Sequence, residues 1–184
     1  MKRLLVTVLV ATLVLTLAIP GAAAVKERQA EGVTSFMLNP TCDPTFSGDP
    51  GTWCPIVDGE VLLGLANPGS KTGTIKGSQL FEGVLAIASD GSLTMTGSVV
   101  FTGRVKACGY GTVEFDVAGS GFLTPGQGSG AFFETNEQTI VGGSLPIEGV
   151  VRELGNGTGN EDGTAGTLEY EGEYTCDQRG RGHS

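Results

Sequence analysis

The chain has 184 residues, of which 31 are Gly, 17% are charged and 7% are aromatic, with a single His. One domain with its own hydrophobic core is expected at this length. The 20 acidic side chains outnumber the 11 basic ones, which excludes a protein built to bind nucleic acid, since phosphates attract a basic surface. Cations and basic surfaces are the favoured charged partners.

The first 24 residues have the organisation of a secretory signal peptide. A basic start precedes an apolar run from Leu4 to Ile19, and Pro20 then leads into small residues that end at Ala24. This pattern predicts export and cleavage after Ala24. An uncleaved anchor is the alternative, but the run is shorter than the roughly 20 residues that span a bilayer. No later apolar run could span a membrane, so we expect a secreted domain.

The remaining chain divides by composition into three parts. Residues 25–32 are charged and polar, which predicts a flexible N-terminal segment, and residues 177–184 are rich in Gly, Arg and Gln, which predicts a disordered tail. Residues 33–176 alternate polar and apolar side chains, and we expect them to form a single domain.

Four cysteines, Cys42, Cys54, Cys108 and Cys176, form an even set. In an exported protein this predicts two disulfides, for which three pairings are possible. We favour Cys42 with Cys54, because these two flank a turn-rich segment that needs a constraint to hold its shape, and Cys108 with Cys176. Zinc binding is disfavoured, because no CxxC pair is present and the only His, His183, lies in the tail.

The domain shows the two-residue period of β-strands throughout and no helical period. Ala88–Ser92 places Asp90-Gly91 between two such stretches and predicts a tight hairpin. Asn67–Ser70 and Gly155–Gly159 also have turn chemistry. The alternation predicts inward-facing side chains at these positions: Leu93, Met95, Val99, Phe101, Val113, Phe115, Val117, Leu168 and Tyr170.

The spacing of these strands predicts an all-β fold, an antiparallel up-and-down barrel of about eight strands, with a β-sandwich as the alternative. We favour the barrel because closure removes the exposed sheet edges. A barrel of this size is filled by side chains or admits one small ligand.

Two Phe-x-Gly motifs, Phe81-Glu82-Gly83 and Phe101-Thr102-Gly103, precede a Gly-rich stretch, Gly155–Gly159, that runs on into Gly166–Tyr174. On these motifs the segment from Gln79 to Cys176 resembles the allene-oxide-cyclase-like barrel group of small bacterial proteins. The resemblance implies a closed barrel of about eight strands and, from the group's name, an isomerase or cyclase acting on an apolar substrate. It carries over no catalytic residue.

Residues for familiar catalytic chemistry are scarce. A Ser-His-acid triad is excluded, because His183 is the only His and no G-x-S-x-G motif is present. Gly126–Ala131 fits a dinucleotide-binding pattern, but it precedes a strand and opens no helix. Glu148, beside apolar neighbours, is the first candidate for acid–base work, although an outward-facing strand residue is the favoured explanation.

One acidic loop has the spacing of a calcium ligand set. Thr158, Asn160, Asp162, Gly163 and Glu169 fit positions 1, 3, 5, 6 and 12 of the calcium-loop pattern. Asn160, Asp162 and Glu169 would then be the metal ligands, and binding would be weak, because Thr occupies the first position in place of Asp. A polar hairpin turn is the favoured explanation, because the first and most demanding ligand is missing. Glu169, Glu171 and Glu173 alternate on one strand face and must point to solvent or to a cation.

Three functions fit these features. The favoured one is a non-enzymatic exported barrel that binds a small apolar ligand or acts as a surface interaction module. An isomerase or cyclase that uses a buried Glu or a water in the barrel is the second, and a weakly calcium-dependent extracellular adhesive module is the third. Catalytic side chains are scarce, so the sequence leans away from an enzyme without deciding the question.

Overall fold

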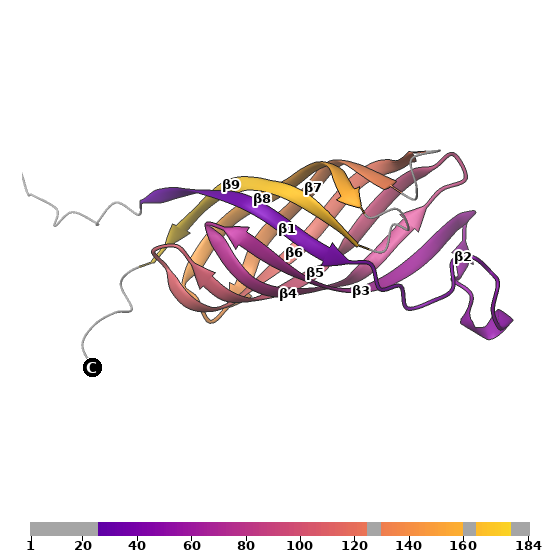
Figure 1. The fold of residues 1–184 in the computed structure, drawn as a ribbon, viewed down its shortest axis with the longest axis horizontal. Helices are drawn as coiled ribbons and strands as arrows, with labels where there is room; N and C mark the ends of the chain where they lie inside the picture. Colours follow the sequence, from indigo (N-terminus) through magenta and orange to yellow (C-terminus); the bar gives the residue numbers. More distant parts are fainter. Residues whose placement is uncertain (1–25, 125–129, 160–164, 178–184) are drawn as a thin grey trace, which may run out of the picture.

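A computed structural model describes residues 26–124, 130–159 and 165–177 (Figure 1). The structure is almost entirely β, with one short 3-10 turn, η1 (Pro50–Thr52). Its nine strands are β1 (Glu27–Met37), β2 (Ile56–Val57), β3 (Glu60–Gly73), β4 (Ile75–Ile87), β5 (Ser92–Val105), β6 (Gly109–Thr124), β7 (Gly130–Gly143), β8 (Ile147–Gly159) and β9 (Ala165–Cys176).

Eight of the strands close into an antiparallel barrel. Their order is β1-β9-β8-β7-β6-β5-β4-β3, and β1 pairs with β3 to complete the circle. The two-residue strand β2 adds to the outer edge of β3. The all-β barrel predicted from the sequence is therefore confirmed, and the sandwich alternative is excluded.

The alternating side chains point into the barrel as their period requires. All nine predicted inward residues are buried, from Phe101 and Phe115, which have no exposed surface, to Met95 at 8%. The Asp90-Gly91 hairpin is also confirmed: Gly91 has a φ of 86°, and the Ala88 amide donates to the Ser92 carbonyl oxygen across the turn. Period and turn chemistry agree at these positions, so the sequence alone specifies them.

Three local predictions are wrong. The segment predicted to be flexible, residues 25–32, belongs to β1 from Glu27 onward, because its backbone pairs with β9 and its Ala30 side chain is buried. The turns predicted at Asn67–Ser70 and Gly155–Gly159 lie inside β3 and β8. Pairing with neighbouring strands overrides the local turn preference there.

The two ends of the barrel differ. The closed end, on the left in Figure 1, holds the β3–β4, β5–β6 and β7–β8 turns and the disulfide Cys108–Cys176. The loop end, on the right, holds the β4–β5 turn and residues 38–59, which carry the disulfide Cys42–Cys54. These are the pairings favoured from the sequence, and two disulfides are typical of an oxidising, extracellular environment.

Within residues 26–124, 130–159 and 165–177, no helix has the length and apolar character needed to cross a membrane. The predicted signal peptide, residues 1–24, and the tail from residue 178 lie outside the described residues.

Candidate functional site

The residues singled out from the sequence lie on the outer surface or outside the described residues. Glu148 is exposed on the outer face of β8, as its outward alternative predicts, and Glu169 is exposed on β9. Asn160 and Asp162 lie outside the described residues, so the calcium loop stays a prediction. Across the described part of the chain, no group of three His, Cys, Asp or Glu side chains is placed to hold a metal ion.

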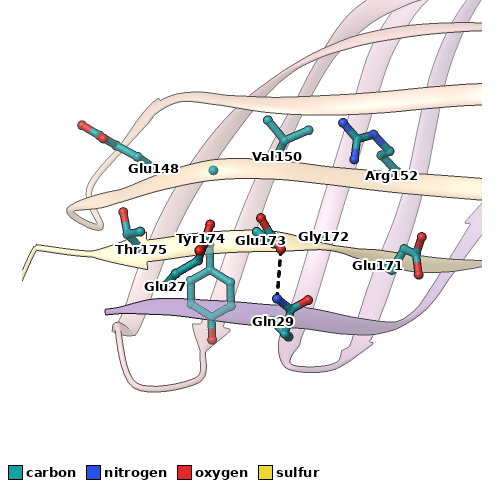
Figure 2. Close-up of a pocket in the computed structure, with 11 residues that line it drawn as sticks. Glu27, Gln29, Glu148, Val150, Arg152, Glu171, Gly172, Glu173, Tyr174 and Thr175 are labelled. Carbon is teal, nitrogen blue, oxygen red and sulfur yellow. Dashed lines mark hydrogen bonds between the residues drawn. The ribbon is translucent and has the colours of Figure 1, made fainter. Parts of the chain in front are cut away.

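Glu148 lines a shallow groove of about 640 Å³ across the outer faces of β1, β9 and β8 (Figure 2). Gln29 Nε2 donates to Glu173 Oε1 over 3.1 Å. A hydrogen bond with Glu173, reinforced by its negative charge, raises the pKa of Glu27, whereas the hydrogen bond from Gln29 lowers the pKa of Glu173. The groove is acidic and open to solvent, and each of these contacts joins neighbouring strands of the sheet.

The barrel interior holds a different set of polar groups, which we call the polar belt. Its members face inward from five strands and are all at least nine-tenths buried. They are Thr34 on β1, Lys71 on β3, Gln79 on β4, Asn136 and Gln138 on β7, and Glu153 on β8. An apolar barrel core does not need these side chains, so the polar belt is the feature of the interior that requires an explanation.

The Glu153 carboxylate is the centre of the polar belt. Its Oε1 lies 2.5 Å from Lys71 Nζ and also accepts a short hydrogen bond from Thr34 Oγ1. Lys71 Nζ in turn donates to Thr34 Oγ1 over 2.8 Å. The other oxygen, Oε2, accepts from Asn136 Nδ2 over 3.2 Å. Four strands thus bring one anion, one cation, one hydroxyl and one amide into contact inside the barrel.

Tyr170 on β9 supports this cluster from the side. Lys71 Nζ lies 4.9 Å from the centre of the Tyr170 ring, a distance at which the cation is attracted to the ring face. The Tyr170 hydroxyl accepts from the Ile75 amide over 3.0 Å and lies 3.0 Å from the Thr72 carbonyl oxygen. Burial raises the pKa of Tyr170, and the negative charge of Glu153 acts in the same direction. Hydrogen bonds thus hold the Tyr170 side chain in place, and its ring packs against the Lys71 ammonium group.

Three amide oxygens of the polar belt have no hydrogen-bond partner among the described residues. They are Asn136 Oδ1, Gln138 Oε1 and Gln79 Oε1. Asn136 and Gln138 are successive inward positions of β7, and Gln79 is opposite Gly69, one inward position from Lys71. Buried polar atoms are almost always paired, so each of these oxygens calls for a donor from a water or a ligand.

Apolar side chains border the polar belt on both sides. Toward the closed end, the inward side chains of Ile75, Val105, Val113 and Val151 have at most 1% of their surface exposed. Toward the loop end, several inward side chains keep 5–8%, namely Leu63, Leu65, Phe81, Leu85 and Met95. Leu145 and Ile147 at the closed end are 9% and 7% exposed, as much as these loop-end side chains, so apolar packing borders the polar belt on both sides.

Sequence reasoning missed the polar belt for two reasons. Asn67-Pro68-Gly69-Ser70 has the composition of a turn, which leaves Lys71 outside any predicted strand. On β8 the sequence candidate is Glu148, which shares its phase with outward residues. Glu153 shares the phase of the buried Ile147 and Val151, and this parity was the signal that could have identified it.

Comparisons with known proteins bear on the fold. No protein-family model matches the chain, and no curated protein matches it. A solved structure of a DUF3224-family protein of unknown function from Shewanella oneidensis MR-1 is similar, with a TM-score of 0.50 and 13% identity over 83% of this chain and 99% of that one.

Two pterocarpan synthase dirigent proteins, PsPTS1 and GePTS1, have TM-scores of 0.47 and 0.45 at 12% and 11% identity. Each match covers 82% of this chain, and they cover 96% and 86% of the respective dirigent chains. At these identities similarity concerns the fold and carries no activity. The barrel implied by the sequence resemblance is present, while membership of the allene-oxide-cyclase-like group stays a prediction.

Proposed function

We propose that this protein is an exported, non-enzymatic barrel that binds one small, largely apolar ligand between the polar belt and the loop end. The observation that carries the proposal is the buried cluster of Glu153, Lys71, Thr34 and Asn136 beside amide oxygens that have no partner in the described part of the chain. The inward apolar side chains on the loop side would contact the body of the ligand.

The polar belt is poorly explained as a device for stability. Moving a carboxylate and an ammonium group out of water costs several kcal/mol each, and apolar side chains of similar volume often serve a core equally well or better. Unpaired amide oxygens add to that cost. A ligand that contacts the polar belt would recover part of it, and this is how binding pockets combine apolar walls with a few placed polar groups.

Catalysis by Glu153 is the second candidate, because a buried carboxylate could move a proton in an isomerase or cyclase. Its contacts favour binding instead. Oε1 already accepts from both Lys71 and Thr34, and Oε2 accepts from Asn136. A general base must be free to reach the proton that it removes. In this arrangement, Glu153 serves better to position its neighbours than to react.

Native mass spectrometry of the protein purified from its own host tests the proposal. We expect a bound molecule that is released on denaturation. Leu85→Phe, which adds bulk to an inward side chain on the loop side, should reduce the bound fraction, whereas Val84→Phe on the outer face should not. A wild-type protein that carries no small molecule and is not stabilised by any apolar probe would overturn the proposal.

A further inference from the structure

The unpaired oxygens of the polar belt bear on the chemical class of the ligand. We infer, on the basis of the proposed function above, that the ligand is uncharged and donates a hydrogen bond to the polar belt through a hydroxyl or amide N–H group. The inference rests on the orientation of Asn136, on the two buried glutamines and on the neutralisation of Lys71 by Glu153.

The orientation of Asn136 is fixed from within the protein. An ionised carboxylate can only accept hydrogen bonds, so the Asn136 atom that faces Glu153 Oε2 must be the NH₂ group. Its other atom, Oδ1, is then an acceptor, and it has no partner among the described residues while the side chain is 3% exposed. A ligand that fits this oxygen must present a donor.

Two further acceptors extend the same surface. Gln138, the next inward residue of β7, has an unpaired Oε1 and is 2% exposed. Gln79 on β4 is 8% exposed and also has an unpaired Oε1. Unpaired amide groups thus occur on two strands of the barrel. The glutamines can present either end to a ligand, so the preference for a donor follows from the fixed Asn136 oxygen, and the glutamines add further places for hydrogen bonds.

The charges of the polar belt disfavour an ionised ligand. Lys71 is the only buried Lys or Arg of the described chain, and its Nζ is held by Glu153, Thr34 and the Tyr170 ring. A carboxylate ligand would have to draw Lys71 away and leave Glu153 as an unpaired buried charge. A cationic ligand would find the carboxylate already paired. A neutral molecule avoids both costs.

Three probes of similar size separate these classes: 1-octanol, its isomer heptyl methyl ether, and octanoate. We expect 1-octanol to bind at least about tenfold more tightly than the ether, which cannot donate, as measured by calorimetric titration of the purified protein. Octanoate should bind more weakly than 1-octanol at neutral pH. Glu137→Gln, at the outward position beside Asn136, should leave the alcohol-to-ether ratio unchanged.

Asn136→Leu should bring the alcohol-to-ether ratio close to one. If that variant does not fold, Gln138→Met removes a neighbouring acceptor without touching Glu153 and should lower the ratio. Equal affinities of the wild-type protein for alcohol and ether, or a preference for octanoate, would overturn the inference and leave the proposed function standing. Failure of all three probes to bind, together with the absence of a bound molecule in the host protein, would overturn both.

Discussion

At the scale of single residues, burial separates two ion pairs of the same chemistry. Lys71 and Glu153 have side chains that are 0% and 4% exposed, whereas Arg152 and Glu137, on the outside of the same barrel, are 57% and 46% exposed. Water and salt screen the outer pair, and its charges lose little if they separate. The inner pair has no such alternative, so its members depend on each other.

This dependence predicts unequal effects of two substitutions. Lys71→Met leaves the Glu153 carboxylate buried without its cation and should lower the free energy of unfolding by about 3–5 kcal/mol. Arg152→Gln should lower it by less than about 1 kcal/mol, because the exposed pair is screened. Urea denaturation measures both.

The double variant Lys71→Met/Glu153→Leu provides the control, because it removes both charges. We expect it to be more stable than Lys71→Met alone, since the penalty comes from the charge left behind. Similar losses for Lys71→Met and Arg152→Gln would show that the inner pair is effectively solvated, and would remove the main support for the polar belt as a binding surface.

The stability of the disulfide-bonded loop, residues 42–54, should depend on pH through one side chain, Asp43. Asp43 accepts hydrogen bonds from the Thr45 hydroxyl over 2.6 Å and from the Thr45 and Gly48 amides over 2.8 and 2.9 Å. The bonds from Thr45 come first among the causes that lower its pKa to about 2. Because the folded pKa lies below the unfolded value of about 4, the stabilisation is present above pH 4 and is lost as the pH falls through 2.

We therefore expect the Thr45 and Gly48 amide signals to titrate together with a midpoint near pH 2 in NMR spectra. Asp43→Asn should abolish this titration and leave the barrel signals in place. A midpoint near pH 4 would contradict the hydrogen-bonded loop geometry.

At the scale of elements, the strands that the sequence specifies are those whose period and flanking turns agree. β5 is the clearest, because its inward and outward positions alternate and Asp90-Gly91 precedes it. β3 could not be specified in this way, because Asn67-Pro68-Gly69-Ser70 has the composition of a turn. Eleven register pairs with β4 keep it extended. Pro68 precedes Gly69, where pairing with β1 begins, so its missing amide leaves that ladder intact.

The functional site depends on the elements that were hardest to predict. Lys71 follows the false turn in β3, and Thr34 follows the segment of β1 that was expected to be flexible. Their side chains meet only because β1 and β3 close the barrel, a contact between segments 37 residues apart that no local pattern encodes. The two-residue period of the sequence identifies which residues face inward. The pairing of β1 with β3 decides which of these residues contact each other.

The seam between β1 and β3 is short, with five register pairs against 14 between β5 and β6. Gly32 lies at one end of it, where a Cβ would overlap the Thr72 carbonyl oxygen and lie 2.6 Å from Tyr170 Oη. Gly32→Ala should therefore separate the seam, lower the free energy of unfolding by about 1–3 kcal/mol and speed hydrogen exchange in β1 and β3.

Gly51→Ala is the matched control, because a Cβ there meets only Asp49 Oδ1 at an ordinary 3.6 Å. It should change neither stability nor exchange appreciably. If Gly32→Ala leaves exchange across β1 unchanged, the seam does not depend on close approach at Gly32, and its other backbone pairs and the Thr34–Lys71 contact hold the barrel closed.

At the scale of the whole molecule, the two disulfides constrain different parts of the barrel. Cys108–Cys176 joins the β5–β6 turn to the end of β9 and closes a separation of 68 residues at the closed end. Cys42–Cys54 spans 12 residues of a loop that lies outside the strand circle. If ligand enters from the loop end, the first bridge constrains the opposite end of the barrel and the second shapes the entrance.

Loop length then predicts the effect of removing each bridge. By the chain-entropy relation, replacing Cys108 and Cys176 with Ala should cost about 4 kcal/mol, and replacing Cys42 and Cys54 about 3 kcal/mol. Because these values are close, the location of the change is the sharper test. Hydrogen exchange should rise around the closed end in the first variant, and in residues 38–59 with little change in the strands in the second.

Ligand binding adds a functional readout to the same pair of variants. Loss of Cys42–Cys54 should change the rate at which a bound probe enters and leaves, because the entrance is loosened while the polar belt keeps its contacts. Loss of Cys108–Cys176 should instead weaken the affinity for the probe, because β9 carries Tyr170, whose ring packs against Lys71. If removing Cys42–Cys54 leaves probe kinetics unchanged while removing Cys108–Cys176 speeds both entry and release, the ligand enters through the closed end of the barrel and not through the loop end.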